Sequence, residues 1–186
     1  MKKEEDVGKS LVGSWVQALG TILAAVGSTP SLVEQEELER DFGLVGNVLQ
    51  ATGNGLEVDS QEDWDFGSYG GIIQATGNLT VTTAYIKDVS EVTEIKLFIT
   101  GNLLQALGAV TALESVEEAY EVVGFYLQAI GNSLQALGDS RRLKIDDTIF
   151  MSNPDVIVAV GSWIQTIGTI LLALGKTYEW TNKSPD

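Results

Sequence analysis

Uncharged stretches rich in apolar residues alternate along the chain with short acidic segments. Six windows hold no charged residue: 11–33, 42–56, 66–86, 97–113, 122–138 and 156–175. Alanine, leucine and glutamine, which are good helix formers, recur in these windows. The pattern therefore predicts six helices, at about residues 8–27, 31–54, 62–87, 91–113, 116–138 and 154–176.

Helix-start signals support this interpretation at three places. Thr29-Pro30 and Asn153-Pro154 each place an N-cap residue before a proline at the first helical position. Ser115–Glu118 has the spacing of a capping box. We therefore expect an all-α fold, an array or bundle of helical hairpins forming a single repeat domain over residues 1–186. A β-solenoid is the alternative, because Gly-Asn pairs at seven-residue intervals can form turns and residues 80–85 resemble a strand.

One phrase, Gly-x-x-(Leu/Ile/Val)-Gln-(Ala/Thr)-x-Gly, occurs seven times, and fifteen of the twenty glycines follow its seven-residue spacing. A glycine inside a helix costs about 0.8–1 kcal/mol relative to alanine, so a close approach of neighbouring helices has to compensate. Gly27, Gly138 and Gly175 are candidate C-caps. The other twelve are predicted to form helix-packing or self-association seams: Gly13, Gly20, Gly46, Gly53, Gly70, Gly77, Gly101, Gly108, Gly124, Gly131, Gly161 and Gly168.

Each copy of the phrase carries a glutamine in the same heptad position. These residues are Gln17, Gln50, Gln74, Gln105, Gln128, Gln135 and Gln165. A buried amide that lacks hydrogen-bond partners costs about 1–3 kcal/mol. We therefore expect the glutamines to pair across adjacent helices as a polar ladder that fixes their register. The alternative is that they face water as ordinary helix formers.

The first and last windows resemble each other most. Gly13–Gly27 and Gly161–Gly175 share ten of fifteen residues, and Trp15 and Trp163 occupy equivalent positions, where we expect them to pack the end helices. Apolar residues also fill most other heptad positions, so the helices require burial on more than one face. A central helix could supply this burial, or neighbouring chains could, with the similar end helices joining chains end to end.

Composition removes several classes of function. Without cysteine or histidine, the chain lacks the usual zinc ligands, thiolate chemistry and the commonest general base. A formal net charge of -15 disfavours nucleic acid as a partner. The basic run Arg141-Arg142-x-Lys144 is interpreted as a solubilising turn, or as a contact for an acidic segment. We expect no enzyme activity, cofactor or metal site and, with no evident signal peptide, a cytoplasmic location.

The end motif GSW(V/I)Q(A/T)(L/I)GTIL and the interior motif GN-x-LQA-x-GN resemble an uncharacterised repetitive protein family of spore-forming bacilli. The resemblance spans essentially the whole chain. It implies a small intracellular repeat protein and brings no activity, substrate or site residues.

The leading hypothesis is a non-enzymatic structural protein whose partner is itself. It would self-assemble into a homo-oligomer, sheet or filament through its glycine seams. The second hypothesis is a membrane-embedded or conditionally inserting, pore-forming protein, because windows 11–33, 66–86 and 156–175 are long enough to cross a bilayer. Recurrent polar residues in every window count against it. The third is a monomeric helical module that binds an apolar ligand between its helices.

Overall fold

The computed structural model describes residues 6–143 and 153–182, which are helical nearly throughout. The helices are α1 (Val7–Gly27), α2 (Glu36–Ser60), α3 (Phe66–Ile86), α4 (Glu91–Ala112), α5 (Ala119–Arg142) and α6 (Pro154–Asn182), with a 3-10 turn, η1 (Leu113–Ser115), after α4. The predicted all-α fold is confirmed. The described residues contain no strand, so the β-solenoid alternative is wrong, and residues 80–85 lie within α3.

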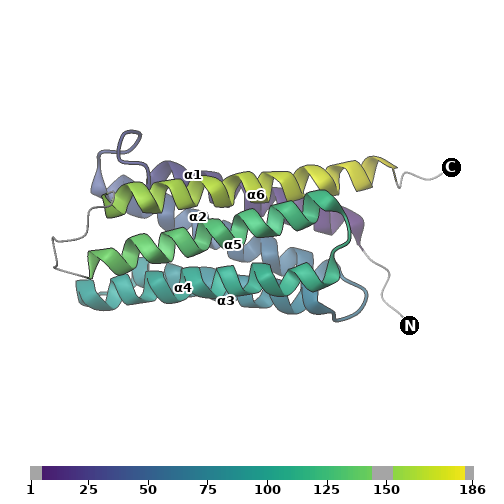
Figure 1. Cartoon of the computed structure of the whole chain (residues 1–186), viewed down its shortest axis with the longest axis horizontal. Helices are drawn as coiled ribbons and strands as arrows, with labels where there is room; N and C mark the ends of the chain where they lie inside the picture. The colour runs from purple at the N-terminus through teal and green to yellow at the C-terminus, as the bar shows by residue number, and fades with distance from the viewer. Residues whose placement is uncertain (1–5, 144–152, 183–186) are drawn as a thin grey trace.

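The six helices form a closed ring. Each helix packs against the helices that precede and follow it in sequence, and α6 packs against α1. Figure 1 shows the helices side by side, with the chain reversing direction from one to the next. Among the described residues, every helix pair in contact consists of neighbours on this ring. No described helix occupies the axis, so the arrangement around a central helix is not the one adopted.

Glycines face glycines inside the three hairpins α1–α2, α3–α4 and α5–α6. A Cβ added to Gly77 would lie 2.6 Å from the carbonyl oxygen of Gly101, and one added to Gly101 would lie 2.7 Å from that of Gly77. The same reciprocal approach pairs Gly13 with Gly53, Gly20 with Gly46, Gly70 with Gly108, Gly124 with Gly168, and Gly131 with Gly161. Any side chain at these positions would force the two backbones apart, and their close contact offsets the propensity cost of helical glycine.

Several helix ends differ from those expected. α2 begins at Glu36 rather than near residue 31, because the backbone N–H groups of Leu32 and Val33 donate to the Thr29 carbonyl in a separate turn. α5 begins at Ala119, and its N-cap residue Glu118 makes no side-chain capping bond. The capping box predicted at Ser115–Glu118 is therefore wrong.

All three predicted C-caps are also wrong, because the C-cap of α1 is Ser28 and the other two glycines are not at helix ends. Gly138 and Gly175 lie inside α5 and α6, which continue to Arg142 and Asn182. Gly27 is the last residue of α1, and no described glycine has a positive φ. The start of α6 at Pro154 matches the prediction, and Asn153 Oδ1 accepts a hydrogen bond from the N–H of Asp155.

Candidate functional site

The interior of the ring is polar. Its largest fully buried side chains are glutamine, asparagine, threonine and serine, whereas the buried apolar side chains are mostly alanine. Gln135 is half-buried. The other six repeat glutamines are at most 5% exposed: Gln17, Gln50, Gln74, Gln105, Gln128 and Gln165. Soluble helical proteins bury large apolar side chains and expose polar ones, so the polarity of this ring is reversed.

Glutamines of the even-numbered helices meet on the ring axis. Gln165 Nε2 donates to Gln50 Oε1 at 2.9 Å and to Gln105 Oε1 at 3.1 Å. Gln165 Oε1 accepts a bond of 2.8 Å from Gln135 Nε2. We call these four residues the glutamine cluster. Because α2, α4 and α6 are not ring neighbours, the bonds of Gln165 to Gln50 and Gln105 cross the lumen, unlike a ladder between adjacent helices.

Other amides of the lumen are less completely paired. Gln17 Nε2 donates to Asn54 Oδ1 at 2.9 Å across the α1–α2 hairpin. Gln128 is fully buried, yet neither of its amide atoms has a hydrogen-bond partner among the described residues. Asn78 Oδ1 and Asn132 Nδ2 are also buried without a partner in this part of the chain. Such groups cost about 1–3 kcal/mol each if left dry, so the lumen is suited to water or a polar solute.

Two cavities extend from the glutamines toward opposite ends of the ring. The Glu57 vestibule has a volume of about 580 Å³ and is bordered by Gln17 and Gln74. The Asp139 vestibule has a volume of about 380 Å³ and is bordered by the glutamine cluster. Residues from all six helices line each vestibule, so both lie on the ring axis.

Carboxylates outnumber bases in the Glu57 vestibule. Its charged lining residues are Glu57, Asp65, Glu118, Glu121, Lys176 and Glu179. Lys176 Nζ lies 3.2 Å from Glu121 Oε1 and 3.4 Å from Glu179 Oε2. Glu57 Oε1 is buried without a hydrogen-bond partner among the described residues. Burial raises the pKa of Glu57 to about 7, with Lys176 opposing and Glu121 adding to the shift.

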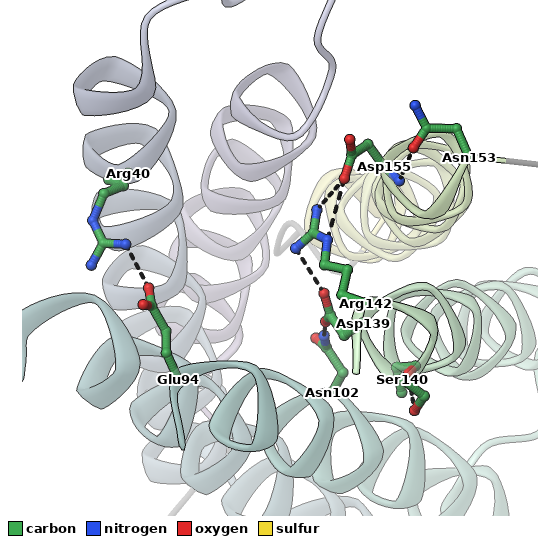
Figure 2. Close-up of polar contacts among 9 residues, drawn as sticks. Arg40, Glu94, Asn102, Asp139, Ser140, Arg142, Asn153 and Asp155 are labelled. Carbon is green, nitrogen blue, oxygen red and sulfur yellow. Dashed lines mark hydrogen bonds and ion pairs between the residues drawn. The ribbon is translucent and has the colours of Figure 1, made fainter. Parts of the chain in front are cut away.

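A network of ion pairs surrounds the Asp139 vestibule. Arg142 Nη1 donates to Asp139 Oδ1 at 3.0 Å, and its Nη2 donates to Asp155 Oδ1 at 2.8 Å. Figure 2 shows these residues across the opening from a second pair, in which Arg40 Nη1 donates to Glu94 Oε1 at 2.5 Å. Burial raises the pKa of Asp139 to about 6 although Arg142 opposes the shift. Arg142 of the basic run thus contacts acids of its own chain, whereas Lys144 lies outside the described residues.

Large apolar side chains are exposed on the outer face of every helix. They include Val12 and Leu19 on α1, Val45 and Val48 on α2, Ile72 and Leu79 on α3, Leu103 and Leu107 on α4, Val123 and Ile130 on α5, and Val160 and Ile167 on α6. Three helical stretches, Val7–Gly27, Glu91–Ser115 and Pro154–Asn182, are long and apolar enough to cross a membrane. This finding weakens the expectation of a cytoplasmic location.

The tryptophans of the end helices bridge the closure of the ring. Trp15 Nε1 donates to Thr177 Oγ1 and Trp163 Nε1 donates to Thr29 Oγ1, both at 3.0 Å. One indole thus donates from α1 to α6, and the other donates from α6 to the turn that follows α1. Their rings stay about one-third exposed on the outer face.

The charged residues of the two vestibules were missed by sequence reasoning. For three of them a signal lies in the glycine spacing, because each lumen glutamine follows a grid glycine by four residues. Glu57, Arg142 and Glu179 follow Gly53, Gly138 and Gly175 by the same interval. The heptad therefore extends the lumen-facing row into charged residues beyond the uncharged windows. Within the described ranges, no group of three or more acidic, cysteine or histidine residues could hold a metal ion.

A family model described as a family of unknown function (DUF6944) matches residues 8–173. No curated protein and no solved structure matches the chain.

Proposed function

The chain belongs to the family of unknown function DUF6944, and we propose that it is an integral membrane protein whose helix ring encloses a polar pathway across the bilayer. The observation that carries this proposal is the reversed polarity of the ring. Amides lie inside it, and large apolar side chains are exposed on all six helices.

The outer face favours lipid as its surroundings. In water, exposed leucine, isoleucine and valine on every side would leave the ring open to aggregation. In a bilayer the same side chains contact acyl chains, while small residues allow close helix packing and internal hydrogen bonds satisfy polar groups. The glycine seams and the bonds of the glutamine cluster fit that environment.

The uncharged length of each helix is close to the thickness of a bilayer. The uncharged helical segments are 11–27, 42–56, 66–86, 97–112, 122–138 and 156–175, or 15 to 21 residues each. At 1.5 Å per residue they span roughly 22–31 Å, against a hydrocarbon core of about 30 Å. α2, α3 and α5 are not among the stretches apolar enough to cross a membrane. Like the other helices they turn buried amides to the lumen, and α2 and α5 also carry charged residues at their ends, beyond the uncharged segments.

The lumen supplies the polar pathway. Two vestibules approach the centre from opposite ends, and amide side chains line both of them. Water and small polar solutes can exchange hydrogen bonds with such amides. The charged residues of the vestibules lie beyond the uncharged segments, at the depth expected for the lipid headgroups. A narrow, amide-lined pore is the activity that this arrangement supports best, and it requires no enzymatic chemistry.

Self-assembly remains a prediction that an apolar exterior also supports, since neighbouring copies could bury the same side chains. It is the second candidate, and the two are compatible if the copies associate within a membrane. Cytoplasmic location and an origin in spore-forming bacilli likewise remain predictions. A dry site for an apolar ligand is disfavoured, because both vestibules are lined by amides and carboxylates.

Co-flotation of the purified chain with liposomes, followed by washing with alkaline carbonate, tests the proposal. We expect the chain to float with the vesicles and to resist extraction. Vesicles that contain it should then swell faster than empty vesicles in an inward gradient of a small polar solute such as urea. A chain that stays soluble without detergent and remains at the bottom of the gradient would contradict membrane insertion.

A further inference from the structure

We infer that the Glu57 vestibule binds small, hydrated monovalent cations such as K⁺ and selects them for the lumen. The inference rests on the proposed function, because it names the class of solute that the same pathway takes. It adds a site at one end of the ring, beside two buried polar atoms, Glu57 Oε1 and Asn54 Nδ2, that have no hydrogen-bond partner among the described residues.

Glu57 occupies a lumen position that carries glutamine elsewhere in the ring. It follows Gly53 by four residues, as Gln17 follows Gly13 and Gln50 follows Gly46. Its side chain lines the vestibule, and Oε1 is buried without a hydrogen-bond partner among the described residues. The nearest base, Lys176, lies against Glu121 and Glu179 instead. A carboxylate oxygen is thus available on the axis.

Amides lie beside this carboxylate. Gln74 lines the vestibule and is 4% exposed. Asn54 is buried equally, and its Nδ2 is unpartnered while its Oδ1 accepts from Gln17. Amide oxygens resemble the carbonyls that replace cation hydration in selective pores, and amide N–H groups can hold water around the ion. These groups indicate a hydrated guest independently of the acidic charge.

The excess of carboxylates over basic groups favours a cation over an anion. Five carboxylates and one ammonium group line the Glu57 vestibule. The opposite vestibule is lined by five carboxylates and two guanidinium groups, so an anion is repelled at both ends. No three carboxylates in the described residues converge as a metal site. Ca²⁺ requires about six to eight oxygen ligands, so a monovalent ion that keeps part of its water suits the site better.

Equilibrium binding of radioactive Rb⁺ to the purified full chain in detergent at alkaline pH tests the site. The wild type should bind Rb⁺, and Glu57→Gln should lose most of that binding. Glu117→Gln is the matched control, because Glu117 is exposed at the same end and does not line the vestibule. It should bind as the wild type does. Equal binding by wild type and Glu57→Gln, or no binding by the wild type, would overturn the site.

Ion flux separates this inference from the proposed function. In bilayers under a KCl gradient, the reversal potential of the wild type should lie toward the equilibrium potential of K⁺. The reversal potential of Glu57→Gln should lie closer to zero. Equal passage of K⁺ and Cl⁻ would overturn cation selection and leave the pathway standing. Rb⁺ binding without passage of either ion would remove the pathway and retain the cation site.

Discussion

The hydroxyl oxygens of Thr21 and Thr169 lie 2.7 Å apart in the buried seam where α1 meets α6. The two threonines occupy equivalent positions, each directly after the second glycine of its phrase. Thr166 Oγ1 adds a bond of 3.0 Å to the Thr21 carbonyl. The most similar segments of the chain therefore contact each other within one molecule, whereas the sequence alone suggested that they would join separate chains.

A disulfide engineered at this seam should form within a single chain. The protein has no cysteine of its own, so a Thr21→Cys, Thr169→Cys variant carries one possible bridge. Mild oxidation should produce a cross-linked monomer of altered mobility on a non-reducing gel, and Thr21→Cys alone should not. Disulfide-linked dimers as the main product would show that α1 and α6 are exchanged between chains.

Adding one methyl group to a hairpin seam should destabilise the protein. The Cβ of Gly77→Ala would lie 2.6 Å from the Gly101 carbonyl oxygen, so the backbones must separate. We expect a loss of about 1–3 kcal/mol in the free energy of unfolding, measured by circular dichroism in detergent.

Gly55→Ala is the matched control for this substitution. Gly55 is also inside a helix, but no atom outside its local backbone lies within 4 Å of the added Cβ. Alanine there should stabilise the helix by up to about 1 kcal/mol. Equal effects of the two substitutions would contradict the close contact of the α3 and α4 backbones at Gly77 and Gly101.

Removing the central amide of the glutamine cluster should damage both stability and flux. Gln165→Leu deprives Gln50 and Gln105 of their shared donor, which should cost about 1–3 kcal/mol for each acceptor left dry. The leucine also places an apolar group on the axis, so solute flux into vesicles should fall. Gln35→Leu, at an exposed N-cap without a side-chain hydrogen bond, should change neither quantity. Unchanged flux in Gln165→Leu would place the pathway elsewhere.

A lysine on the outer face should reveal whether lipid surrounds the ring. Ile167 is 56% exposed near the middle of the uncharged part of α6. A lysine at the centre of a membrane helix costs about 2.5–3.5 kcal/mol of insertion free energy, so Ile167→Lys should reduce the membrane-integrated fraction after carbonate washing. Thr181→Lys, beyond the uncharged segment, should insert normally. If the ring is soluble instead, Ile167→Lys would improve solubility.

Cation selectivity should fall as the pH falls through about 7. Burial raises the pKa of Glu57 to about 7, so the carboxylate is charged above that pH and neutral below it. Lys176 from α6 favours the charged form and Glu121 from α5 disfavours it. The wild-type reversal potential should therefore move toward zero between about pH 8 and pH 6. In Glu57→Gln it should vary much less with pH.

The raised pKa also has a consequence for stability. The folded state binds the Glu57 proton more tightly than the unfolded state does. The stabilising contribution of protonated Glu57 to the free energy of unfolding is therefore greatest below about pH 4.5 and is lost as the pH rises through about 7. Glu57→Gln should therefore gain stability relative to the wild type at alkaline pH, as measured by thermal unfolding. A constant difference between the two proteins at all pH values would contradict the assignment.

The helices and their shared faces were predictable from local spacing. Seven-residue intervals keep the glycines on one face of each helix, and the glutamine four residues later lies on nearly the same face. That relationship does not say whether the glutamine side meets an adjacent helix, solvent or a lumen. The answer depends on the contact between α1 and α6, which are separated by most of the chain. Gln165 bonds Gln135 of the neighbouring helix α5, as a ladder between neighbours requires, and also bonds Gln50 and Gln105 across the axis, which the sequence did not suggest.

The ends of the lumen were harder to recognise because charged residues stand there in place of the repeat glutamines. Glu57 and Arg142 keep the four-residue interval from a glycine, but they are not glutamines and fall beyond the uncharged windows. Gly138 and Gly175 were interpreted as helix ends for the same reason. Once α5 and α6 continue past them, the next lumen position on each helix carries a charged side chain.

Every helix of the closed ring has two neighbours, so the ring itself does not depend on which helix the chain begins with. Gly8 on α1 lies beside Trp180 on α6, with 3.3 Å between an added Cβ and Trp180 Cζ3, and Figure 1 shows the start of α1 and the end of α6 at the same end of the molecule. A linker could join these helices while the chain is reopened between α3 and α4, at residues 87–90, and every pair of neighbours would be kept. The order of synthesis is thus separable from the order around the axis, and a circular permutant should rebuild the same lumen.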